Sequence, residues 1–362
     1  VDPLMEIQPF SSELAFGGFA LAHNGNLTNA GRLRASLIET GSLFQSSSDT
    51  EVIVHLVARS HQDSVTDRLV DALKQIEGAY SLVCVADDML IGVRDPHGVR
   101  PLVLGQRENT WLLASESCAL DIVGATPVRE LDPGEMVVID QHGVHSTKPF
   151  QPVSSRFCVF EYVYFSRPDS VVEGRGVYHA RKAIGAELAR ESHIEADMII
   201  PVPDSGVPAA LGYAEASATP FDLGIIRNHY VGRTFIQPTQ KGRTDSVKLK
   251  HNANPAAVRG KRIVLVDDSI VRGTTSRKIV TMMRNAGAAE VHMRIARPPT
   301  THPCFYGVDT PSQDQLIAAQ MSVEQISKEI GVDSLAFITV DGMYRAIADI
   351  NRDTDKPQFC DA

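Results

Sequence analysis

Apolar residues in the first 150 positions occur in short runs that end at turn-forming residues. The apolar runs occupy residues 18–22, 80–85, 89–93 and 111–114. Turn-forming sequences such as Asn-Gly-Asn, at residues 24–26, follow them. Runs of this length and punctuation are typical of strands in a mostly antiparallel sheet. A helical pattern at residues 49–58 interrupts them, with its apolar face formed by Val52, Ile53, Leu56 and Val57. We therefore predict an α+β sandwich for this half of the chain.

The pattern changes after residue 156, where strands and helices alternate. Three apolar runs predict buried strands, and two periodic segments predict helices; they lie at residues 198–200, 263–266 and 291–295, and at 209–216 and 275–285. Gly287 is placed to end the second helix. Strands separated by helices imply a parallel sheet that binds ligands at the carboxyl ends of its strands. This half therefore reads as an α/β domain.

A connector separates the two patterns. Residues 147–155 contain two Pro and three hydroxyl residues, a composition that suits an extended linker. A chain of 362 residues also suggests about two domains. We predict domains at residues 1–150 and 156–362.

The amino-acid composition limits which binding partners and which cellular compartment we expect for this protein. The net charge of −9 disfavours a general affinity for nucleic acid or anionic membranes. We find no apolar run long enough to span a bilayer and no secretory signal. The five Cys are an odd number at wide spacings, which argues against a disulfide framework and favours a reducing, cytoplasmic compartment.

One basic segment stands out in this acidic chain. Residues 227–262 hold nine Lys or Arg and a single acid, Asp245. Such a segment suggests either a small anionic ligand or a solvated loop, and charge alone does not decide between them. Its length favours a lid that closes over a substrate, with a solvated insertion as the alternative.

The second predicted strand of the α/β half ends in two carboxylates, Asp267 and Asp268. A loop and the start of a helix follow, and they supply Ser269, Arg272, Gly273, Thr274 and Thr275. A helix start offers free N–H groups to a phosphate, and the carboxylates suit ribose hydroxyls, directly or through Mg²⁺. An ordinary turn with a helix cap is the alternative. The complete string favours a site for a phosphorylated ribose and resembles the signature of type I phosphoribosyltransferases.

A second loop, at residues 203–206, follows the first strand of this half and precedes a helix. Its Asp204, Ser205 and neighbouring amides suit a pyrophosphate group held with Mg²⁺, although Pro-Asp-Ser-Gly is also a good turn. We predict that Ser205, Asp267 and Asp268 form the magnesium site.

The chain resembles the amidophosphoribosyltransferase family over nearly its whole length. The most specific stretches are residues 159–170 (VFEYVYFSRPDS), 230–236 (YVGRTFI) and the loop after Asp267. The resemblance implies an Ntn-type class II glutaminase domain followed by a type I phosphoribosyltransferase domain. It implies that ammonia from glutamine displaces pyrophosphate from phosphoribosyl pyrophosphate (PRPP). The products would be 5-phosphoribosylamine, glutamate and pyrophosphate, in the first step of de novo purine synthesis.

The resemblance assigns the glutamine site to residues of the N-terminal half. Asn24 and Gly25 take the place of an oxyanion hole, in which amide N–H groups stabilise a tetrahedral intermediate. Without the resemblance, Asn-Gly suggests a hairpin turn. Asp49 matches the position that holds the glutamine α-amino group, and its alternative is a helix N-cap.

The N-terminus departs from the family pattern. Family members begin with a nucleophilic Cys, whereas this sequence begins at Val1, without an initiator Met. We therefore expect a fragment, and we expect no glutaminase activity from the sequence as written.

The cysteines divide into two groups. Cys84 and Cys118 lie in apolar surroundings and are predicted core residues. Cys158, Cys304 and Cys360 fall on three of the four positions that bind a [4Fe–4S] cluster in one branch of the family, and the fourth position lies one residue past Ala362. The alternative is that these three scattered cysteines bind no cluster.

Two other functions stay open on the residues alone. A phosphoribosyltransferase acting on a nucleobase would share the Asp267–Asp268 loop but would not need Asn24, Gly25 or Asp49. A non-catalytic regulator that binds PRPP would not need the loop at 203–206. The resemblance also implies a homo-oligomer, a tetramer, that is inhibited by purine nucleotides.

Overall fold

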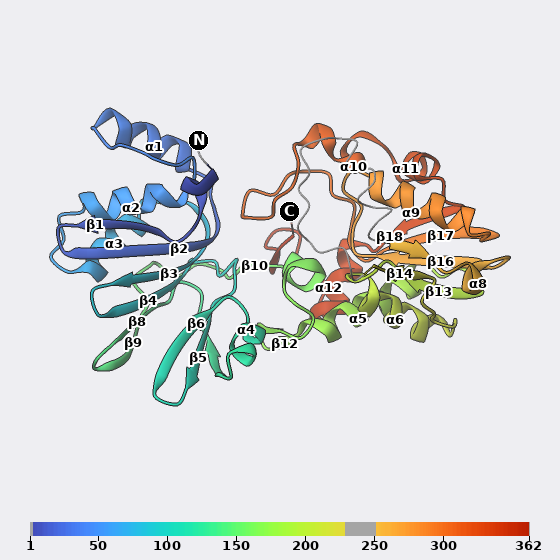
Figure 1. Ribbon diagram of the computed structural model, residues 1–362, viewed down its shortest axis with the longest axis horizontal. Coiled ribbons are helices and arrows are strands. Elements are labelled where there is room, and N and C mark those ends of the chain that lie inside the picture. Colours follow the sequence, from blue (N-terminus) through green and yellow to red (C-terminus); the bar gives the residue numbers. More distant parts are fainter. Residues whose placement is uncertain (1–2, 229–250, 362) are drawn as a thin grey trace.

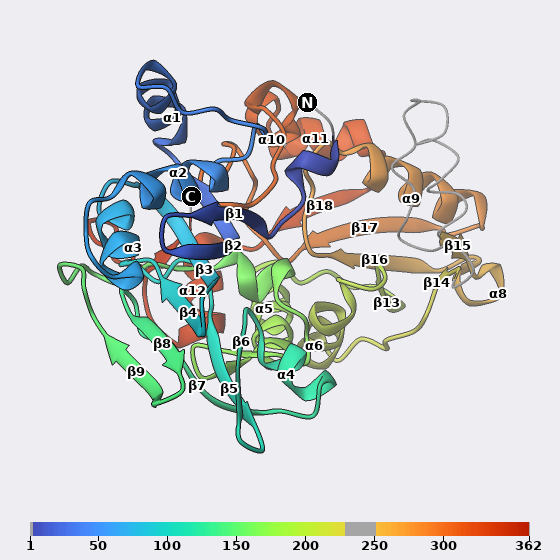
Figure 2. The same cartoon turned by 60° about the vertical axis from the view of Figure 1, so that its left-hand side comes forward.

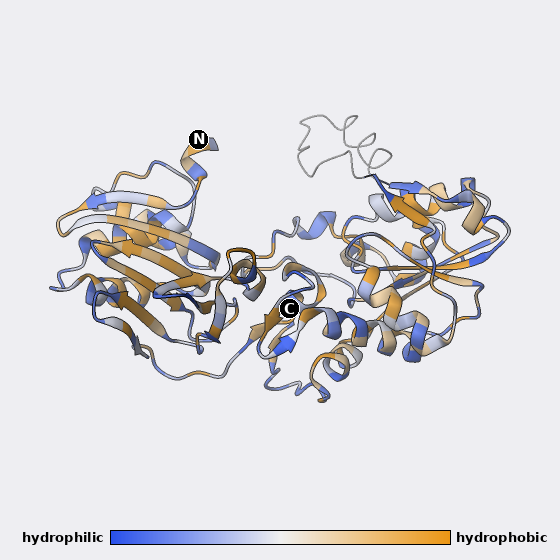
Figure 3. Ribbon diagram, turned by 60° about the horizontal axis from the view of Figure 1, so that its bottom comes forward, coloured by the Kyte–Doolittle hydropathy of each residue, from blue (hydrophilic) through white to orange (hydrophobic). Residues whose placement is uncertain are grey.

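The computed structural model describes residues 3–228 and 251–361, which form two layered parts that meet near the middle of the molecule (Figure 1). In these ranges, no helix is long and apolar enough to cross a membrane. Figure 3 shows the apolar residues concentrated along the strands of both parts.

The N-terminal part is built on a six-stranded antiparallel sheet of order β1-β2-β3-β4-β8-β9. Its strands are β1 (Phe10–Leu14), β2 (Gly17–Leu27), β3 (Gly78–Ala86), β4 (Met89–Arg94), β8 (Met136–Asp140) and β9 (Gly143–Thr147). A second sheet, β6-β5-β7, consists of β5 (Val103–Arg107), β6 (Thr110–Ala114) and β7 (Thr126–Glu130). The helical segments are η1 (Pro3–Glu6), α1 (Ala30–Glu39), α2 (Thr50–Arg59), α3 (Val65–Leu73) and α4 (Ser117–Ile122).

The two faces of the large sheet are covered differently. The apolar side of α2 and α3 packs on β2, β3 and β4, where Val52 and Leu69 are fully buried against residues such as Leu21. Leu104 of the second sheet and Leu102, just before it, belong to a smaller cluster. This arrangement confirms the predicted α+β sandwich and the predicted helix at residues 49–58.

The prediction of a turn at residues 24–26 is wrong. β2 continues through these residues to Leu27, and Asn24 and Gly25 pair with Ser81 and Tyr80 of β3. Gly25 has φ of +150°, and a Cβ there would lie 2.0 Å from the carbonyl oxygen of Ala79. Pairing with β3 therefore overrides the local turn preference of Asn-Gly, and the close approach requires glycine.

The C-terminal part contains a four-stranded parallel sheet of order β13-β16-β17-β18. Its strands are β13 (Met198–Pro201), β16 (Arg262–Asp267), β17 (Glu290–Ile295) and β18 (Ser334–Phe337). The main helices are α5 (Val177–Glu191), α6 (Val207–Ser217), α9 (Thr274–Asn285), α11 (Val323–Ile330) and α12 (Val340–Ala348). The three predicted strands and two predicted helices are confirmed, whereas β18, α5, α11 and α12 were not predicted.

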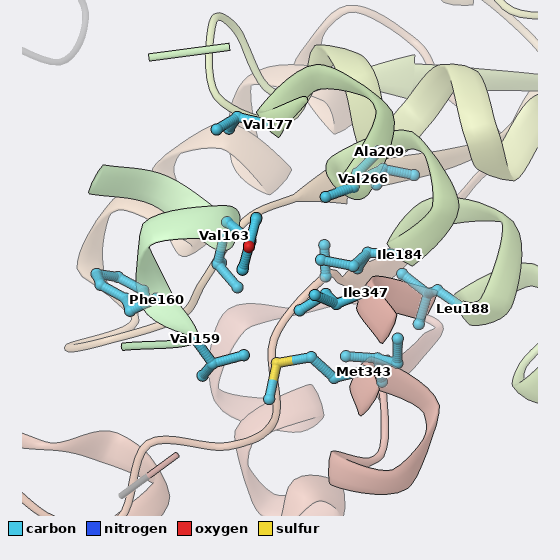
Figure 4. Close-up of a cluster of buried hydrophobic side chains, with 14 of the residues drawn as sticks. Val159, Phe160, Val163, Val177, Ile184, Leu188, Ala209, Val266, Met343 and Ile347 are labelled. Carbon is cyan, nitrogen blue, oxygen red and sulfur yellow. The ribbon is translucent and has the colours of Figure 1, made fainter. Parts of the chain in front are cut away.

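Helices cover both faces of this sheet (Figure 2). On one face, Val264 and Val266 belong to a cluster with α5, α6 and α12, in which Ile184 lies near Ile347 (Figure 4). On the other face, Ile263 and Leu265 pack with α9 and α11. Burial on both faces explains why these strands read as continuous apolar runs.

Shorter elements complete the C-terminal part. They are β10 (Phe157–Cys158), η2 (Glu161–Phe165, a π-helix), β11 (Val171–Val172), β12 (Arg175–Gly176), β14 (Ile225–Arg227), β15 (His251–Ala253), α8 (Pro255–Val258), η3 (Gln313–Gln315), α10 (Ile317–Gln320) and β19 (Phe359–Cys360). The connector at residues 148–156 forms no helix or strand. β10 pairs in parallel with β19, so the two ends of the C-terminal part meet beside the connector.

A buried arginine joins the two parts. Arg94 is 1% exposed and donates to the carbonyl oxygens of Gly98, Arg100 and Leu131. It also donates to a carboxylate oxygen of Glu173, at 2.6 Å, in the turn between β11 and β12. Because every contact is to an acceptor and little solvent reaches the group, this arginine ties the C-terminal hairpin to the N-terminal sandwich.

Glu130 on β7 faces the same turn. Its titration should make the free energy of unfolding depend on pH. Burial and the charge of Glu173 raise the pKa of Glu130 to about 7, from an ordinary value of 4.5. The folded state therefore holds this proton more tightly than the unfolded state, so stability should fall as pH rises between about 4.5 and 7. We expect Glu130→Gln to raise the free energy of unfolding by about 2 kcal/mol at pH 8 and to change it little at pH 4.

Urea denaturation of both proteins at the two pH values measures this effect. Glu13→Gln, at an exposed carboxylate of β1, is the matched control and should leave the difference between the two pH values unchanged. An equal change of stability at both pH values in Glu130→Gln would contradict the assignment.

Candidate active sites

Two carboxylates lie at the carboxyl end of β16, as the sequence predicts. Asp267 and Asp268 are 6% and 8% exposed, and the amide of Asp268 donates to Oδ1 of Asp267 at 2.9 Å. Burial and the neighbouring charge of Asp268 raise the pKa of Asp267 well above its ordinary value. Two adjacent buried carboxylates without a cation are unfavourable, so the pair favours a ligand that supplies positive charge or hydroxyl donors.

The loop at residues 203–206 meets these carboxylates directly. The hydroxyl of Ser205 donates to Oδ1 of Asp268 at 2.6 Å, and the hydroxyl of Ser269 donates to Oδ2 of Asp268 at 2.9 Å. The contact forms because β13 and β16 are neighbours and parallel, which brings the loops after both strands to one edge of the sheet. Asp204 is oriented differently and pairs with Arg227 of β14.

The loop after Asp268 leads into an uncapped helix start. Gly273 has φ of +73° and precedes α9, and none of the described side chains caps the helix. A Cβ at Gly273 would lie 2.7 Å from Cδ1 of Ile317, so a larger residue would be strained and crowded. Thr274 and Thr275 are exposed in the first turn. Free N–H groups, a positive dipole end and two hydroxyls make this turn suitable for a phosphate.

Arg272 lies in the same loop but does not face the carboxylates. Its Nε and Nη2 donate to Oε1 of Gln315 at 3.1 and 2.9 Å. In this state Arg272 therefore links the loop to η3 at the surface.

The oxygen atoms at this edge suit Mg²⁺. Ser205, Asp267 and Asp268 provide a hydroxyl and two carboxylates, which are hard ligands of the kind Mg²⁺ prefers. Over residues 3–228 and 251–361, no group of three or more His, Cys, Asp and Glu side chains is arranged to hold a metal ion alone. Mg²⁺ commonly takes only one or two protein carboxylates and completes its shell with water and substrate phosphates, so this donor set fits.

Sequence reasoning missed Arg181 of α5. Arg181 lines a small cavity with Ser205 and Asp268, and its Nε and Nη2 donate to the carbonyl oxygens of Tyr162 and Ser166 at 2.8 and 2.6 Å. Burial lowers the pKa of Arg181. The charge of Asp268 acts in the opposite direction but does not outweigh burial. The available signal was an arginine on the apolar side of the helix, between Ala180 and Ile184.

The residues assigned to glutamine lie on β2 and at the start of α2. The Oδ1 atom of Asn24 accepts from Nη2 of Arg100 at 3.2 Å, and its Nδ2 donates to the hydroxyl of Ser115 at 3.3 Å. Gly25 follows in the strand, in contact with the loop at Gly307 of the C-terminal part.

Asp49 does not cap α2, so the N-cap interpretation is wrong. Although it occupies the N-cap position, its carboxylate accepts no capping hydrogen bond from a backbone N–H of the first turn, and the donor from that turn is the Thr50 hydroxyl, at 3.4 Å. Its Oδ2 instead accepts from the amide of Leu27 at 2.8 Å and lies 3.7 Å from Nδ1 of His23. Burial raises the pKa of Asp49, but the hydrogen bonds and the charge of His23 outweigh it and the net shift is downward. The carboxylate is thus held ionised beside β2, as binding of an ammonium group requires.

Loops of the C-terminal part reach this strand. Nδ2 of Asn26 donates to the carbonyl oxygen of Phe305 at 2.8 Å. β2, which carries residues assigned to glutamine by the family resemblance, and the loop after β17 are therefore in direct contact.

Three cysteines line one cavity. Cys158, Cys304 and Cys360 border a space of about 300 Å³, and Cys158 and Cys360 are register partners in β10 and β19. Burial raises the pKa of the Cys158 thiol to about 12. Cys84 and Cys118 are buried, which confirms them as core residues, and no disulfide joins any of the five, all of which are described.

Paired carboxylates and an uncapped helix at the edge of a parallel sheet, joined to an antiparallel sandwich, define a phosphoribosyltransferase linked to a glutamine amidotransferase. Family models agree: a glutamine amidotransferase domain matches residues 1–121, and a phosphoribosyl transferase domain matches residues 173–297. The chain is also 53% identical over 364 residues to the amidophosphoribosyltransferase of Rhizobium etli, covering 99% of this chain and 73% of the relative. It belongs to the amidophosphoribosyltransferase family.

Other relatives agree. The Bacillus subtilis amidophosphoribosyltransferase is 50% identical over 331 residues, covering 91% of this chain and 70% of the relative. The chloroplastic amidophosphoribosyltransferase 1 of Arabidopsis thaliana is 52% identical, and the chain spans 62% of its length. The structure of glutamine PRPP amidotransferase from B. subtilis, complexed with ADP and GMP, matches with a TM-score of 0.91 at 48% identity, over 98% of this chain and 78% of that one.

The function follows from this membership. The protein is an amidophosphoribosyltransferase that transfers ammonia derived from glutamine to PRPP, giving 5-phosphoribosylamine, glutamate and pyrophosphate. This reaction is the first step of de novo purine biosynthesis. The expectations of a nucleobase phosphoribosyltransferase and of a non-catalytic regulator are thereby set aside.

Proposed function

We propose that PRPP binds across the edge of the parallel sheet where Ser205 contacts Asp268. That contact carries the proposal, because it joins two loops that were predicted separately to bind different ends of one substrate. The residues of the site are Asp204, Ser205, Asp267, Asp268, Ser269, Arg272, Gly273, Thr274 and Thr275. The uncapped start of α9 receives the 5′-phosphate, and the amides at residues 204–206 receive the pyrophosphate.

In this arrangement Asp267 and Asp268 accept hydrogen bonds from the ribose hydroxyls. Ser205, Asp267 and Asp268 would hold Mg²⁺, which when bound would supply positive charge beside the pyrophosphate group. The protein's part is to fix the ribose so that ammonia meets C1 from the side opposite the pyrophosphate. The proposed lid falls mainly at residues 229–250, outside the described residues, and of the basic segment 227–262 only residues 227–228 and 251–262 are described.

On the N-terminal side, we propose that the amides of Asn24 and Gly25 stabilise the oxyanion formed from glutamine and that Asp49 holds its α-amino group. These roles are supported by the ionised state of Asp49, which is held by the amide of Leu27 on β2, and by the position of Asn24 and Gly25 on that same strand. We also propose domain limits at residues 1–150 and 156–362, and the connector at 148–156, which forms no helix or strand, supports them.

Pyrophosphate release from PRPP tests the acceptor site. We expect release with ammonia that depends on Mg²⁺, followed by release with glutamine in the full-length enzyme. Tight binding of PRPP without pyrophosphate release under either condition would contradict the proposed site and favour a regulatory role.

We also propose that Cys158, Cys304 and Cys360 contribute to a [4Fe–4S] cluster with a structural role. Three thiols from separate segments around one cavity support it, and the positive charge of a bound metal would offset the burial that raises the pKa of the Cys158 thiol. Full-length protein purified without oxygen should show iron–sulfur absorbance that is lost in Cys304→Ser. Iron-free protein with full activity would contradict the assignment.

Regulation and assembly are proposed on the family alone. The relative solved with ADP and GMP supports inhibition by purine nucleotides, and we infer a homotetramer. A cytoplasmic location accords with five cysteines that form no disulfide.

A further inference from the structure

The orientation of the Asn24 side chain decides whether it can stabilise an oxyanion. Only Nδ2 donates hydrogen bonds, whereas Oδ1 would repel a negative oxygen, so the amide must be held with one edge fixed. A guanidinium only donates, and Nη2 of Arg100 donates to Oδ1 of Asn24 at 3.2 Å. This contact assigns Oδ1 to Arg100 and leaves Nδ2 on the other edge, where its present bond to Ser115 is long, at 3.3 Å.

Arg100 is itself buried and held in place. Its side chain is 6% exposed, and its guanidinium lies 4.7 Å from the centre of the Phe165 ring. Its Nη1 lies 3.0 Å from Oε1 of Glu161, whose side chain is 3% exposed. These two atoms are poorly aligned and neither has another hydrogen-bond partner among the described residues, so the attraction is ionic rather than a well-formed hydrogen bond.

Glu161 comes from the other part of the molecule, at the start of η2. The hydroxyl of Ser166 donates to its Oε2 at 2.6 Å. Arg181 fixes the same segment through the carbonyl oxygens of Tyr162 and Ser166. A carboxylate of the phosphoribosyltransferase half is therefore rigidly placed to hold an arginine of the glutaminase half.

We propose that Arg100, held by Glu161, is a positioning residue for the glutaminase reaction. It fixes the amide of Asn24 with Nδ2 toward the developing oxyanion and places a buried positive charge behind it. The inference rests on the proposed oxyanion role of Asn24. It means that the N-terminal half does not complete its own oxyanion site, because the residue that secures the arginine belongs to the acceptor half.

Kinetics of the full-length enzyme test the proposal. In Arg100→Met, kcat for glutamine hydrolysis should fall by about tenfold to a hundredfold, less than the 10²- to 10³-fold typical for loss of an oxyanion donor. KM for glutamine should change by less than about threefold, because Asp49 and not Arg100 holds the substrate. Arg100→Lys keeps the charge and a donor, and should recover part of the loss.

A double-mutant cycle distinguishes positioning from a general structural role. In an Asn24→Ala background, Arg100→Met should lower kcat by less than about twofold, since no amide is left to orient. Loss by the same factor in both backgrounds, or an equal loss of ammonia-dependent pyrophosphate release, would overturn the proposal. Arg129→Met, which breaks an arginine–carboxylate pair with Glu135 away from Asn24, is the matched control and should leave kcat unchanged.

One further variant, and Asn24→Ala measured alone, keep the outcome interpretable. Removing Arg100 leaves Glu161 buried without its partner, and burial already raises the pKa of Glu161, so Arg100→Met is also made with Glu161→Gln. The double variant should fold and show the same loss of kcat. If Asn24→Ala alone leaves kcat unchanged, the proposed oxyanion role fails; if only Asn24→Ala lowers kcat, the oxyanion role stands and the positioning role fails.

Discussion

Replacing Asp268 with Asn is expected to lower pyrophosphate release by about 10²- to 10³-fold, with ammonia and with glutamine alike. Asp268 accepts hydroxyl hydrogen bonds from Ser205 and Ser269, so it lies where the two loops that we propose to bind PRPP meet. An amide keeps the shape of the side chain but removes the charge that attracts Mg²⁺ and one of its acceptor oxygens. Both amine donors are affected equally because both depend on the same bound PRPP.

The thermal stability of Asp268→Asn should not fall with its activity. Burial together with the charge of Asp268 raises the pKa of Asp267, so removing that charge relieves repulsion in the folded state. We expect Asp268→Asn to melt at the same temperature as the parent protein or higher, measured without Mg²⁺ or PRPP. Loss of activity with unchanged stability would show that the pair is kept for ligand binding rather than for folding.

An aspartate at the opposite end of the same sheet provides the control. Asp197 precedes β13, is exposed and pairs with Arg262 at 3.0 Å. Asp197→Asn should change pyrophosphate release by less than about twofold. Retention of more than a tenth of the activity in Asp268→Asn would contradict the proposed site.

The largest effect on folding is expected where α5 crosses α6. A Cβ at Gly185 would lie 1.8 Å from the carbonyl oxygen of Ala209, and one at Gly212 would lie 1.8 Å from that of Lys182. Both clashes are with backbone, so the helices must separate and open the core that they share with the sheet. We expect Gly185→Ala or Gly212→Ala to lower the free energy of unfolding by about 3–5 kcal/mol.

Urea denaturation measures the free energy of unfolding of these variants. A helical glycine with open space around it provides the control. A Cβ at Gly31 of α1 has no atom within 4 Å, so Gly31→Ala should raise stability by about 0.5–1 kcal/mol through helix propensity. Destabilisation of less than 1 kcal/mol in both crossing variants would mean that the helices are not packed as closely as described.

Much of the acceptor site was predictable because its signals are local. Four apolar residues, two aspartates and a Gly-Thr-Thr sequence all fall within residues 263–275, and this short stretch supplies strand, loop and helix start without help from distant residues. Ser205 required one further step, the expectation that neighbouring parallel strands end at the same edge.

Distant contacts account for what could not be predicted. Arg100 and Asn24 are 76 residues apart, and Arg181 looks like any arginine in an amphipathic helix until its carbonyl partners are placed. The Asn24–Gly25 sequence was misread for the same reason, since its turn preference is local and its pairing with β3 is not. Asp49 was misassigned as a possible cap because β2 offers it a better donor than its own helix does.

The pairing of β10 with β19 determines which contacts can form early and which must form late while the chain is being synthesised. Next to it, Arg156 donates to the carbonyl oxygen of Pro357, 201 residues later. A ribosome delivers the chain from its N-terminus, so the sandwich and most of the α/β half emerge before β10 has a partner. Contacts of such long sequence separation raise the contact order and form late, because a long loop must close first. The pairing that joins the two ends of the C-terminal part is therefore expected to form last, after the sandwich and the parallel sheet have been free to fold around their own cores.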